Sequence, residues 1–267
     1  MKAITKILGA GAVCGALAMA SAPAWALNVG GVIWDPDSIF DVQISTFELR
    51  ENAVGALNDE LYGYGKIGNI NGTGEGTFCP GCELTIQFSG FLVDNLVDTD
   101  SDASTIEQVI FRLGNVKFYV DSSPDYNSAS EASAGPDADT KLWLELDGHS
   151  HARSGFPGTG TLFSTISTGD PLNPGSSSNA SGGVGMFDVV GGLAAGNFDT
   201  NTIASSNGFA DFAFSSSFYF QGALVDFPIV GTGELTGNSV PEPATLGLMG
   251  IGLIGLGAMA RRRRAKA

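Results

Sequence analysis

The chain has 267 residues and a formal net charge of −15, and only 15% of its residues are charged. Seven of the 13 basic residues lie near the two ends, so residues 27–238 carry six basic residues against 27 acidic ones, a net charge of −21. A body this acidic repels phosphate backbones and anionic lipid, which excludes nucleic acid as a partner. The charge instead favours solubility outside the cell, cation binding, or contact with neutral or basic glycans.

The N-terminal residues have the pattern of a secretory signal peptide. Two lysines precede an apolar run over residues 7–20, and Ala24 and Ala26 form the A-x-A pattern of a cleavage site. We therefore expect residues 1–26 to be removed after export through the Sec machinery. Cys14 has Val13 before it rather than the small residue that lipoprotein processing needs, so lipidation is rejected.

The rest of the chain up to residue 238 predicts strands and almost no helix. Apolar side chains recur at every second position, which is the pattern of half-buried strands. The clearest runs are 40–49, 84–88, 142–146 and 210–220. Within the first run, a slip in the alternation places Phe47 on the apolar side, and the last and longest run is expected to be a central strand.

Within residues 109–120, the apolar residues change from odd-numbered to even-numbered positions. Phe111 and Leu113 share one parity, whereas Val116 and Phe118 share the other. A two-residue turn at Gly114-Asn115 would explain the change by folding the segment into a hairpin. A bulge at Gly114 is the alternative.

Segments rich in Gly, Ser, Asn, Asp and Pro separate the strands at residues 69–76, 122–139 and 173–185, and a last short strand is expected within 232–240. Many short strands and many turns, without any helical periodicity, predict an all-β domain. We expect one domain over residues 27–238, a β-sandwich or a jelly roll, because that length suffices for a single core.

Cys79 and Cys82 are the only cysteines outside the signal peptide, and Pro-Gly separates them. Pro and Gly suit a type II turn, whose ends lie close enough for a disulfide. An oxidising compartment would then pair them. A catalytic dithiol would need a following helix, whereas the residues that follow alternate like a strand.

Asp98, Asp100 and Asp102 alternate like the start of a calcium loop. Ala103 and Val109 stand where an EF-hand has its glycine and its bidentate glutamate, so the segment is no EF-hand. The two interpretations left are a structural calcium site and a solvated acidic loop.

A second candidate metal cluster consists of residues that share one parity. Glu145, Asp147, His149 and His151 would face one way on an extended chain. Gly148 is expected to interrupt the strand, in which case the two histidines form an exposed loop pair.

Residues 239–267 form a tripartite tail. Pro241, Glu242 and Pro243 keep the backbone extended, and residues 244–260 are uncharged and long enough to span a thinned bilayer as a helix. The chain then ends in a cluster that would stop transfer and stay in the cytoplasm, namely Arg261, Arg262, Arg263 and Arg264.

These three elements in this order resemble the PEP-CTERM sorting signal of Gram-negative bacteria, over about a tenth of the chain. The resemblance implies a precursor anchored in the inner membrane with a periplasmic body. It further implies recognition by an exosortase, cleavage near the motif, and release to the cell surface or the exopolysaccharide matrix. An ordinary C-terminal anchor is the alternative.

The body carries no nucleophile elbow, P-loop, zinc-protease motif or dinucleotide fingerprint. We therefore expect a non-enzymatic surface or biofilm-matrix protein without a cofactor, apart from the calcium considered above. The alternative is a carbohydrate-binding module, which needs exposed aromatic rings. Its candidates are Tyr62, Tyr64, Trp143 and Tyr219. A glycoside hydrolase, which needs two carboxylates in a cleft, is the third candidate.

Overall fold

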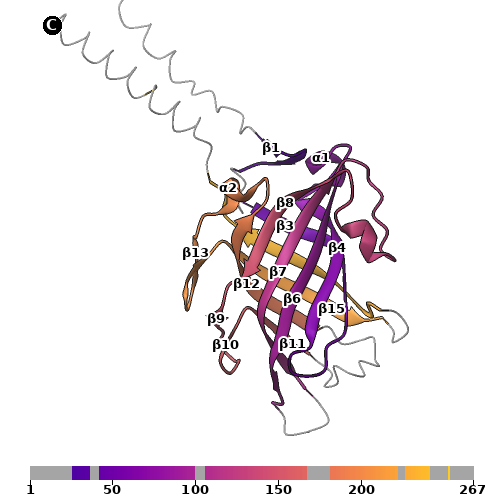
Figure 1. Cartoon of the computed structure of the whole chain (residues 1–267). Coiled ribbons are helices and arrows are strands. Elements are labelled where there is room, and N and C mark those ends of the chain that lie inside the picture. The colour runs from indigo at the N-terminus through magenta and orange to yellow at the C-terminus, as the bar shows by residue number, and fades with distance from the viewer. Residues whose placement is uncertain are drawn as a thin grey trace, which may run out of the picture.

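The structure of the protein, a computed structural model, describes residues 26–36, 42–99, 106–166, 181–221, 226–240 and 252. Nearly all secondary structure in these residues is strand, which confirms the all-β prediction (Figure 1). Only three short helical turns interrupt the strands: α1 (Glu75–Phe78), η1 (Glu131–Ala134) and α2 (Ala195–Phe198). Each is too short to form a layer, so strands build most of the core, and α1 and α2 add Phe78 and Phe198 to it.

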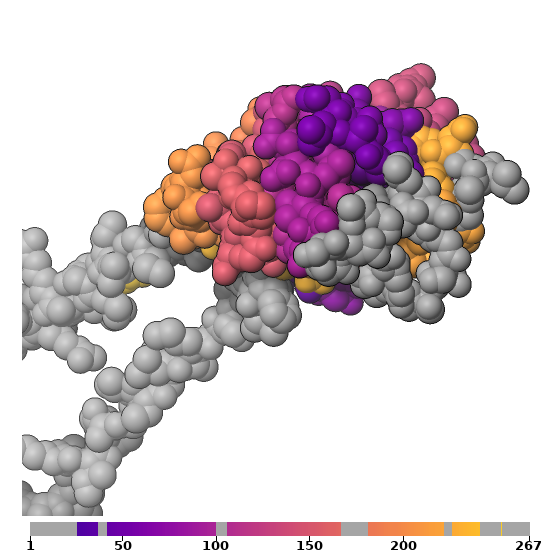
Figure 2. Space-filling view, turned by 90° about the horizontal axis from the view of Figure 1, so that it is seen from below, coloured from indigo at the N-terminus to yellow at the C-terminus, as the bar shows by residue number. Residues whose placement is uncertain are grey.

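Eight antiparallel strands form one sheet that closes on itself. In their order around the ring they are β3 (Val42–Glu51), β4 (Glu60–Ile70), β6 (Glu83–Val97), β7 (Gln108–Asp121), β8 (Thr140–Gly148), β12 (Ser181–Gly191), β15 (Phe212–Phe220) and β16 (Ile229–Gly237). The short strand β11 (Leu162–Thr165) pairs with both β7 and β12. Figure 2, which views the molecule from below, shows yellow β16 beside violet β3, the C-terminal strand of the barrel beside its first one.

The predicted sandwich or jelly roll is therefore replaced by a closed barrel. The ring closes where β8 pairs with β12, for example Leu146 opposite Val189. Alternating apolar residues bury one face of a strand equally well in two facing sheets or in one closed sheet. For the same reason, the long strand predicted over residues 210–220 lies in the ring as β15 rather than at the centre of an open sheet. The strand β12 also starts at Ser181, inside a segment predicted to be a loop.

One end of the barrel is filled by aromatic side chains. Trp34 on β2 (Val32–Trp34) lies 5.0 Å from Phe198 and 5.9 Å from Trp143, measured between ring centroids. The hairpin of β2 and β1 (Leu27–Val29) covers this end, and Trp143 donates a 3.0 Å hydrogen bond from Nε1 to the carbonyl oxygen of Val29. A barrel of eight strands is narrow enough for such side chains to fill it.

Residues 109–120 form one strand rather than the predicted hairpin. Leu113 and Gly114 have φ of +61° and +100°, and Gly90 on the paired strand β6 has φ of +75°. Both strands kink at the same level, so their apolar residues point inward on both sides of the kink. A Cβ on Gly114 would collide with the ring of Phe91, so close packing requires glycine there.

Phe47 points away from the core, so its predicted apolar placement is wrong. The register of β3 against β4 shifts around Thr46, and Phe47 is 73% exposed. An extra residue in one strand turns the next side chain outward, as in a β-bulge. The slip in the alternation is real, but it exposes the aromatic ring instead of burying it.

Several short strands lie outside the ring of eight. β5 (Thr73–Gly74) pairs with the last residues of β4. Two hairpins lie to one side in Figure 1. They are β9 (His151–Ala152) with β10 (Thr159–Gly160), and β13 (Ile203–Ser205) with β14 (Gly208–Ala210).

Candidate functional site

A cavity of about 120 Å³ lies inside the barrel, at the end away from the aromatic cluster. Apolar side chains such as Leu61, Ile86, Phe111 and Phe218 supply most of its wall. Closed barrels of eight strands have room for filling side chains or for one small ligand. An apolar cavity of comparable size, ~150 Å³, stays dry and takes up benzene.

The cavity exists because small residues face inward at this end. Ser164, Ser181 and Ser216 line it where the other end of the barrel has tryptophan and phenylalanine. Gly183 and Gly185 on the neighbouring strand β12 add no space to it, because a Cβ would come within 2.7 Å of Ser216 Oγ or 2.8 Å of the Thr161 carbonyl oxygen, respectively. The space therefore lies beside the three serines.

Glu51 is the only carboxylate among the described residues that line this cavity. It is the last residue of β3 and points inward like Leu49, two positions earlier. Its backbone pairs with Gly63 on β4 and Ile229 on β16, neither of which is ionisable. Burial raises the pKa of Glu51 from 4.5 to about 7. At neutral pH the cavity therefore contains a carboxyl group poised to gain or lose its proton.

The outer face of the barrel carries a shallow hollow between two exposed aromatic rings. Phe47 is 73% exposed and Tyr219 is 45% exposed, and Glu48 and Gln221 also line the hollow. Arg50 donates hydrogen bonds to Glu48 at 2.6 Å and to Gln221 at 3.0 Å. We call Phe47, Glu48, Tyr219 and Gln221 the outer aromatic groove. It offers flat rings beside fixed polar groups.

A serine, a histidine and an aspartate lie in one hydrogen-bonded row. His149 Nδ1 lies 2.8 Å from an oxygen of Asp188, and His149 Nε2 lies 2.9 Å from Ser205 Oγ. This is the order of groups in a Ser-His-Asp triad. The sequence gives no local sign of it, because the three residues come from separate elements.

The other bonds of Ser205 explain the row as an anchor for a hairpin. Ser205 Oγ accepts the backbone N–H of Asn207 at 3.0 Å and lies 3.2 Å from the carbonyl oxygen of Gly208. Ser205 and Gly208 are also the pair that closes the turn between β13 and β14. The Asn207 N–H, which would be a candidate oxyanion donor, is thus occupied by the nucleophile itself, and the Asp188 side chain is 40% exposed.

Glu83, Asp121 and Asp125 bring carboxylate oxygens within 4.8 Å of one another. Glu83 is nevertheless occupied, because it accepts backbone N–H groups from Asp125 and Tyr126 at 2.8 Å. Its other oxygen lies 2.9 Å from Lys66 Nζ. Burial lowers the pKa of Lys66, but hydrogen bonds to the carboxylates of Glu75 and Glu83 raise it further, so Lys66 keeps its charge. This cluster fixes the loop after β7 to the barrel wall.

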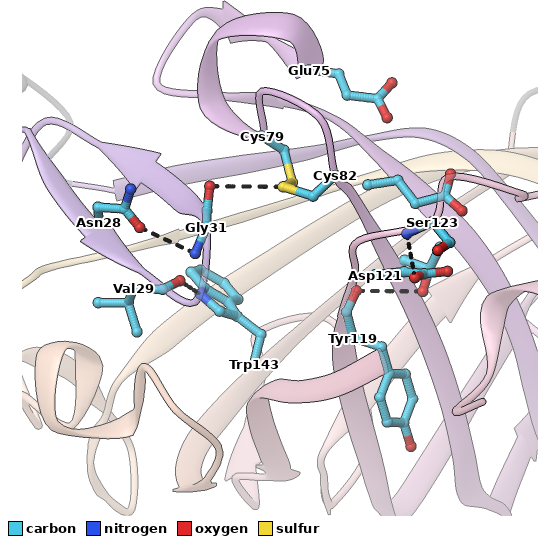
Figure 3. The surroundings of a disulfide bond; sticks show 12 residues. Asn28, Val29, Gly31, Glu75, Cys79, Cys82, Tyr119, Asp121, Ser123 and Trp143 are labelled. Carbon is cyan, nitrogen blue, oxygen red and sulfur yellow. Dashed lines mark hydrogen bonds between the residues drawn. A yellow bond between two sulfur atoms is a disulfide. The ribbon is translucent and has the colours of Figure 1, made fainter. Parts of the chain in front are cut away.

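The structure joins Cys79 and Cys82 in a disulfide with Cα atoms 5.1 Å apart, the pairing predicted from their spacing. Figure 3 shows the bridge beside the β1–β2 hairpin, where Cys82 Sγ lies 3.7 Å from the carbonyl oxygen of Gly31. Trp143 reaches the same hairpin from below. The bridge thus lies at the closed end of the barrel, away from the cavity.

Most predicted sorting and calcium residues lie outside the described part of the chain. This holds for Ala24, Asp100 and Asp102, and likewise for Pro241, Glu242, Pro243, Arg261, Arg262, Arg263 and Arg264. Ala26 and Asp98 are described and exposed. The calcium site therefore stays a prediction.

The proposed histidine metal cluster does not form. His149 and His151 are 9% and 4% exposed, so the expected exposed histidine pair is wrong as well. Glu145 and Asp147 instead accept hydrogen bonds from the side chain of Asn115. β8 ends at Gly148, and His149 beyond it bonds to Asp188 and Ser205 instead of joining the two carboxylates.

Two of the four predicted glycan-binding rings are buried. Tyr64 is 2% exposed and donates a hydrogen bond to the carbonyl oxygen of Ser128, and Trp143 is 0% exposed. Tyr62 is half-buried, and only Tyr219 is exposed. Phe47, which was predicted to face the core, is exposed as well.

The raised pKa of Glu51 predicts a specific pH dependence of stability. The unfolded chain loses this proton near pH 4.5, whereas the folded barrel keeps it up to about pH 7. The free energy of unfolding should therefore fall as pH rises between these values, by at most roughly 3 kcal/mol, since one pKa unit corresponds to about 1.4 kcal/mol. Glu51→Gln should remove this contribution, so that the variant gains stability over the wild type as pH rises from 4.5 to 8.

Urea unfolding of both proteins across this range measures the difference. Leu49→Val, in the wall of the same cavity, changes no ionisable group and is the matched control: its effect on stability should be the same at every pH. A stability difference between wild type and Glu51→Gln that is independent of pH would contradict the raised pKa of this carboxyl group.

Comparison with known proteins identifies the C-terminal tail. A family model described as the PEP-CTERM protein-sorting motif matches residues 239–264. Searches of the curated proteins and of the solved structures found no match. Within the described residues, no helix has the length and apolar character needed to cross a membrane, and the predicted spanning segment 244–260 lies almost wholly outside them. The chain thus carries a PEP-CTERM sorting motif and is an exported protein addressed to an exosortase.

Proposed function

We propose that this protein is a non-enzymatic component of the cell surface or of the exopolysaccharide matrix of a biofilm, placed there by exosortase processing. The observation that carries the proposal is the position of the sorting motif relative to the barrel. The last strand β16 ends at Gly237, and the motif begins at residue 239. Cleavage within or after the motif therefore leaves every strand of the barrel in the released body.

The junction between barrel and tail is held in place. The backbone N–H of Val240 donates a 2.8 Å hydrogen bond to the carbonyl oxygen of Asn197 in α2. Pro241 follows at once, and proline disfavours helix in the residue before it, so we expect Val240 to lead into the motif as extended chain. Extended substrate is what a protease or transpeptidase needs to bind. The inner-membrane anchor and the periplasmic body of the precursor follow from the same signal.

The absence of catalytic activity is part of the proposal. The row of Ser205, His149 and Asp188 is the arrangement nearest to a catalytic one that we identify in the described residues. A hydrolase needs, besides the row, free donors aimed at the oxyanion and a place for the acyl group. The backbone donor of Asn207 is engaged by Ser205 itself. This supports an anchoring role for the row.

Carbohydrate binding is a second candidate, and the outer aromatic groove favours it. Exposed rings stack on sugar faces, and adjacent polar groups bond hydroxyls. Phe47 and Tyr219 supply the rings, while Arg50 holds Glu48 and Gln221 in fixed positions between them. A matrix protein that binds exopolysaccharide through this groove would be retained where it is released.

The sorting proposal is tested by changing the motif. Glu242→Ala or Pro243→Ala should leave an unprocessed precursor in the inner membrane, since the exosortase would lose its recognition element. Immunoblots of membrane and surface fractions measure the two forms. Glu131→Ala, an exposed glutamate in η1, is the control and should be processed normally. Equal processing of the motif variants and the control would refute the proposal.

The non-enzymatic proposal is tested at Ser205. A fluorophosphonate reagent labels activated serines, and we expect no labelling of the native exported protein, because Ser205 Oγ is engaged in its own turn. Mass spectrometry of the treated protein gives the modified residue, and turnover of short-chain chromogenic esters is measured in parallel. Stoichiometric labelling that disappears in Ser205→Ala would show that the row is catalytic.

The glycan candidate is tested with the exopolysaccharide of the producing cells. Phe47→Ala and Tyr219→Ala should each weaken binding about 5- to 10-fold, the effect of losing one stacked ring. Phe209→Ala is the matched control, because Phe209 is 57% exposed on β14, away from the groove. Co-sedimentation with the polysaccharide measures binding. Similar losses in all three variants would mean that the groove has no special role.

A further inference from the structure

The cavity inside the barrel has two properties that the proposed function does not use. It is lined almost wholly by apolar side chains, and it contains one carboxyl group, that of Glu51. A void in a core lowers stability, because the atoms around it lose contacts that a larger side chain would make. Replacing Ser164, Ser181 or Ser216 by a larger apolar residue would fill this one. The three serines keep open a space that a well-packed core would fill, which is what a binding site needs.

We propose that the barrel binds a small molecule with one short apolar chain or ring and a single cationic amino group, the apolar part in the cavity and the ammonium group against Glu51. The inference concerns the interior of the barrel, which shares Tyr219 with the outer aromatic groove.

The volume limits the apolar part of the ligand. About 120 Å³ is slightly less than the ~150 Å³ of a cavity that accommodates benzene. One ring of that size, or a chain of about five carbons, would therefore fill the space. Phe88, Phe214 and Phe218 line the walls and would make most of the contacts.

The carboxyl group selects the polar part of the ligand. A lone carboxylate in an apolar environment is unfavourable, and an ammonium group placed beside it removes that penalty. The ionisable groups around Glu51 do not supply such a cation. Glu48 and Arg50 face outward on the same strand and bond to each other, and Tyr219 is the one other ionisable residue among the described residues of the lining. The strong negative charge of the body also attracts cations to the barrel.

The test compares two probes of equal length, 1-pentylamine and 1-pentanol, on the exported protein as recovered from the cells, purified without detergent. Calorimetry or ligand-observed NMR at pH 8 should give at least 10-fold tighter binding of the amine. Glu51→Gln should reduce the amine to the affinity of the alcohol and leave alcohol binding intact, which also shows that the variant is folded. Glu131→Gln, an exposed glutamate on η1 that lines neither the cavity nor the groove, should behave as wild type.

A change of pH gives a second, independent readout. Because burial raises the pKa of Glu51 to about 7, its ionised fraction falls from about 0.9 at pH 8 to about 0.01 at pH 5. Binding of the amine should weaken by about 90-fold over this range if the ionised form alone pairs with ammonium, whereas binding of the alcohol should not weaken.

Each result supports or overturns the proposal. Equal affinity for amine and alcohol in the wild type would show that Glu51 does not select charge. Binding of methylamine as tight as that of 1-pentylamine would assign the effect to the acidic surface rather than to the cavity. If neither five-carbon probe binds, the cavity is a packing void. Retained preference for the amine in Glu51→Gln would place the cation elsewhere.

Discussion

The structure depends on one constraint, the closure of the sheet. When β8 pairs with β12, every strand of the ring has neighbours on both sides, and the hydrogen-bonding groups of its edges are used within the barrel. Closure also fixes which side chains lie inside. The same strands that alternate along the sequence then converge on one interior, which is filled with aromatic rings at one end and left partly empty at the other.

The two ends of the barrel differ in their roles: side-chain packing at one end stabilises the fold, and the other end contains the proposed binding cavity. The filled end holds Trp34, Trp143 and Phe198, and the disulfide and the β1–β2 hairpin lie over it. The other end has three serines in the wall of the cavity, and Glu51 among apolar side chains. Packing at the first end holds the ring together, so the second end can keep a space and an unpaired acid without loss of the fold.

The barrel positions the outer aromatic groove and the start of the tail. The bulge in β3 turns Phe47 outward beside Tyr219, and Arg50 fixes the polar groups between the rings. The hydrogen bond of Val240 to α2 sets the point at which the chain leaves the body. The groove and the cavity share the wall of the barrel at Tyr219, whereas the tail starts beside α2.

The sequence by itself determined the sorting tail, the all-β class and the pairing of Cys79 with Cys82, because each depends on residues close together in the chain. Alternation located the strands but left sandwich and barrel open, since both bury one face of a strand. Only the tertiary structure decided the closure and the kink at Gly114. It also brought together Ser205, His149 and Asp188, and placed Glu51 inside. Those features arise from strands far apart in sequence, so no local pattern specifies them.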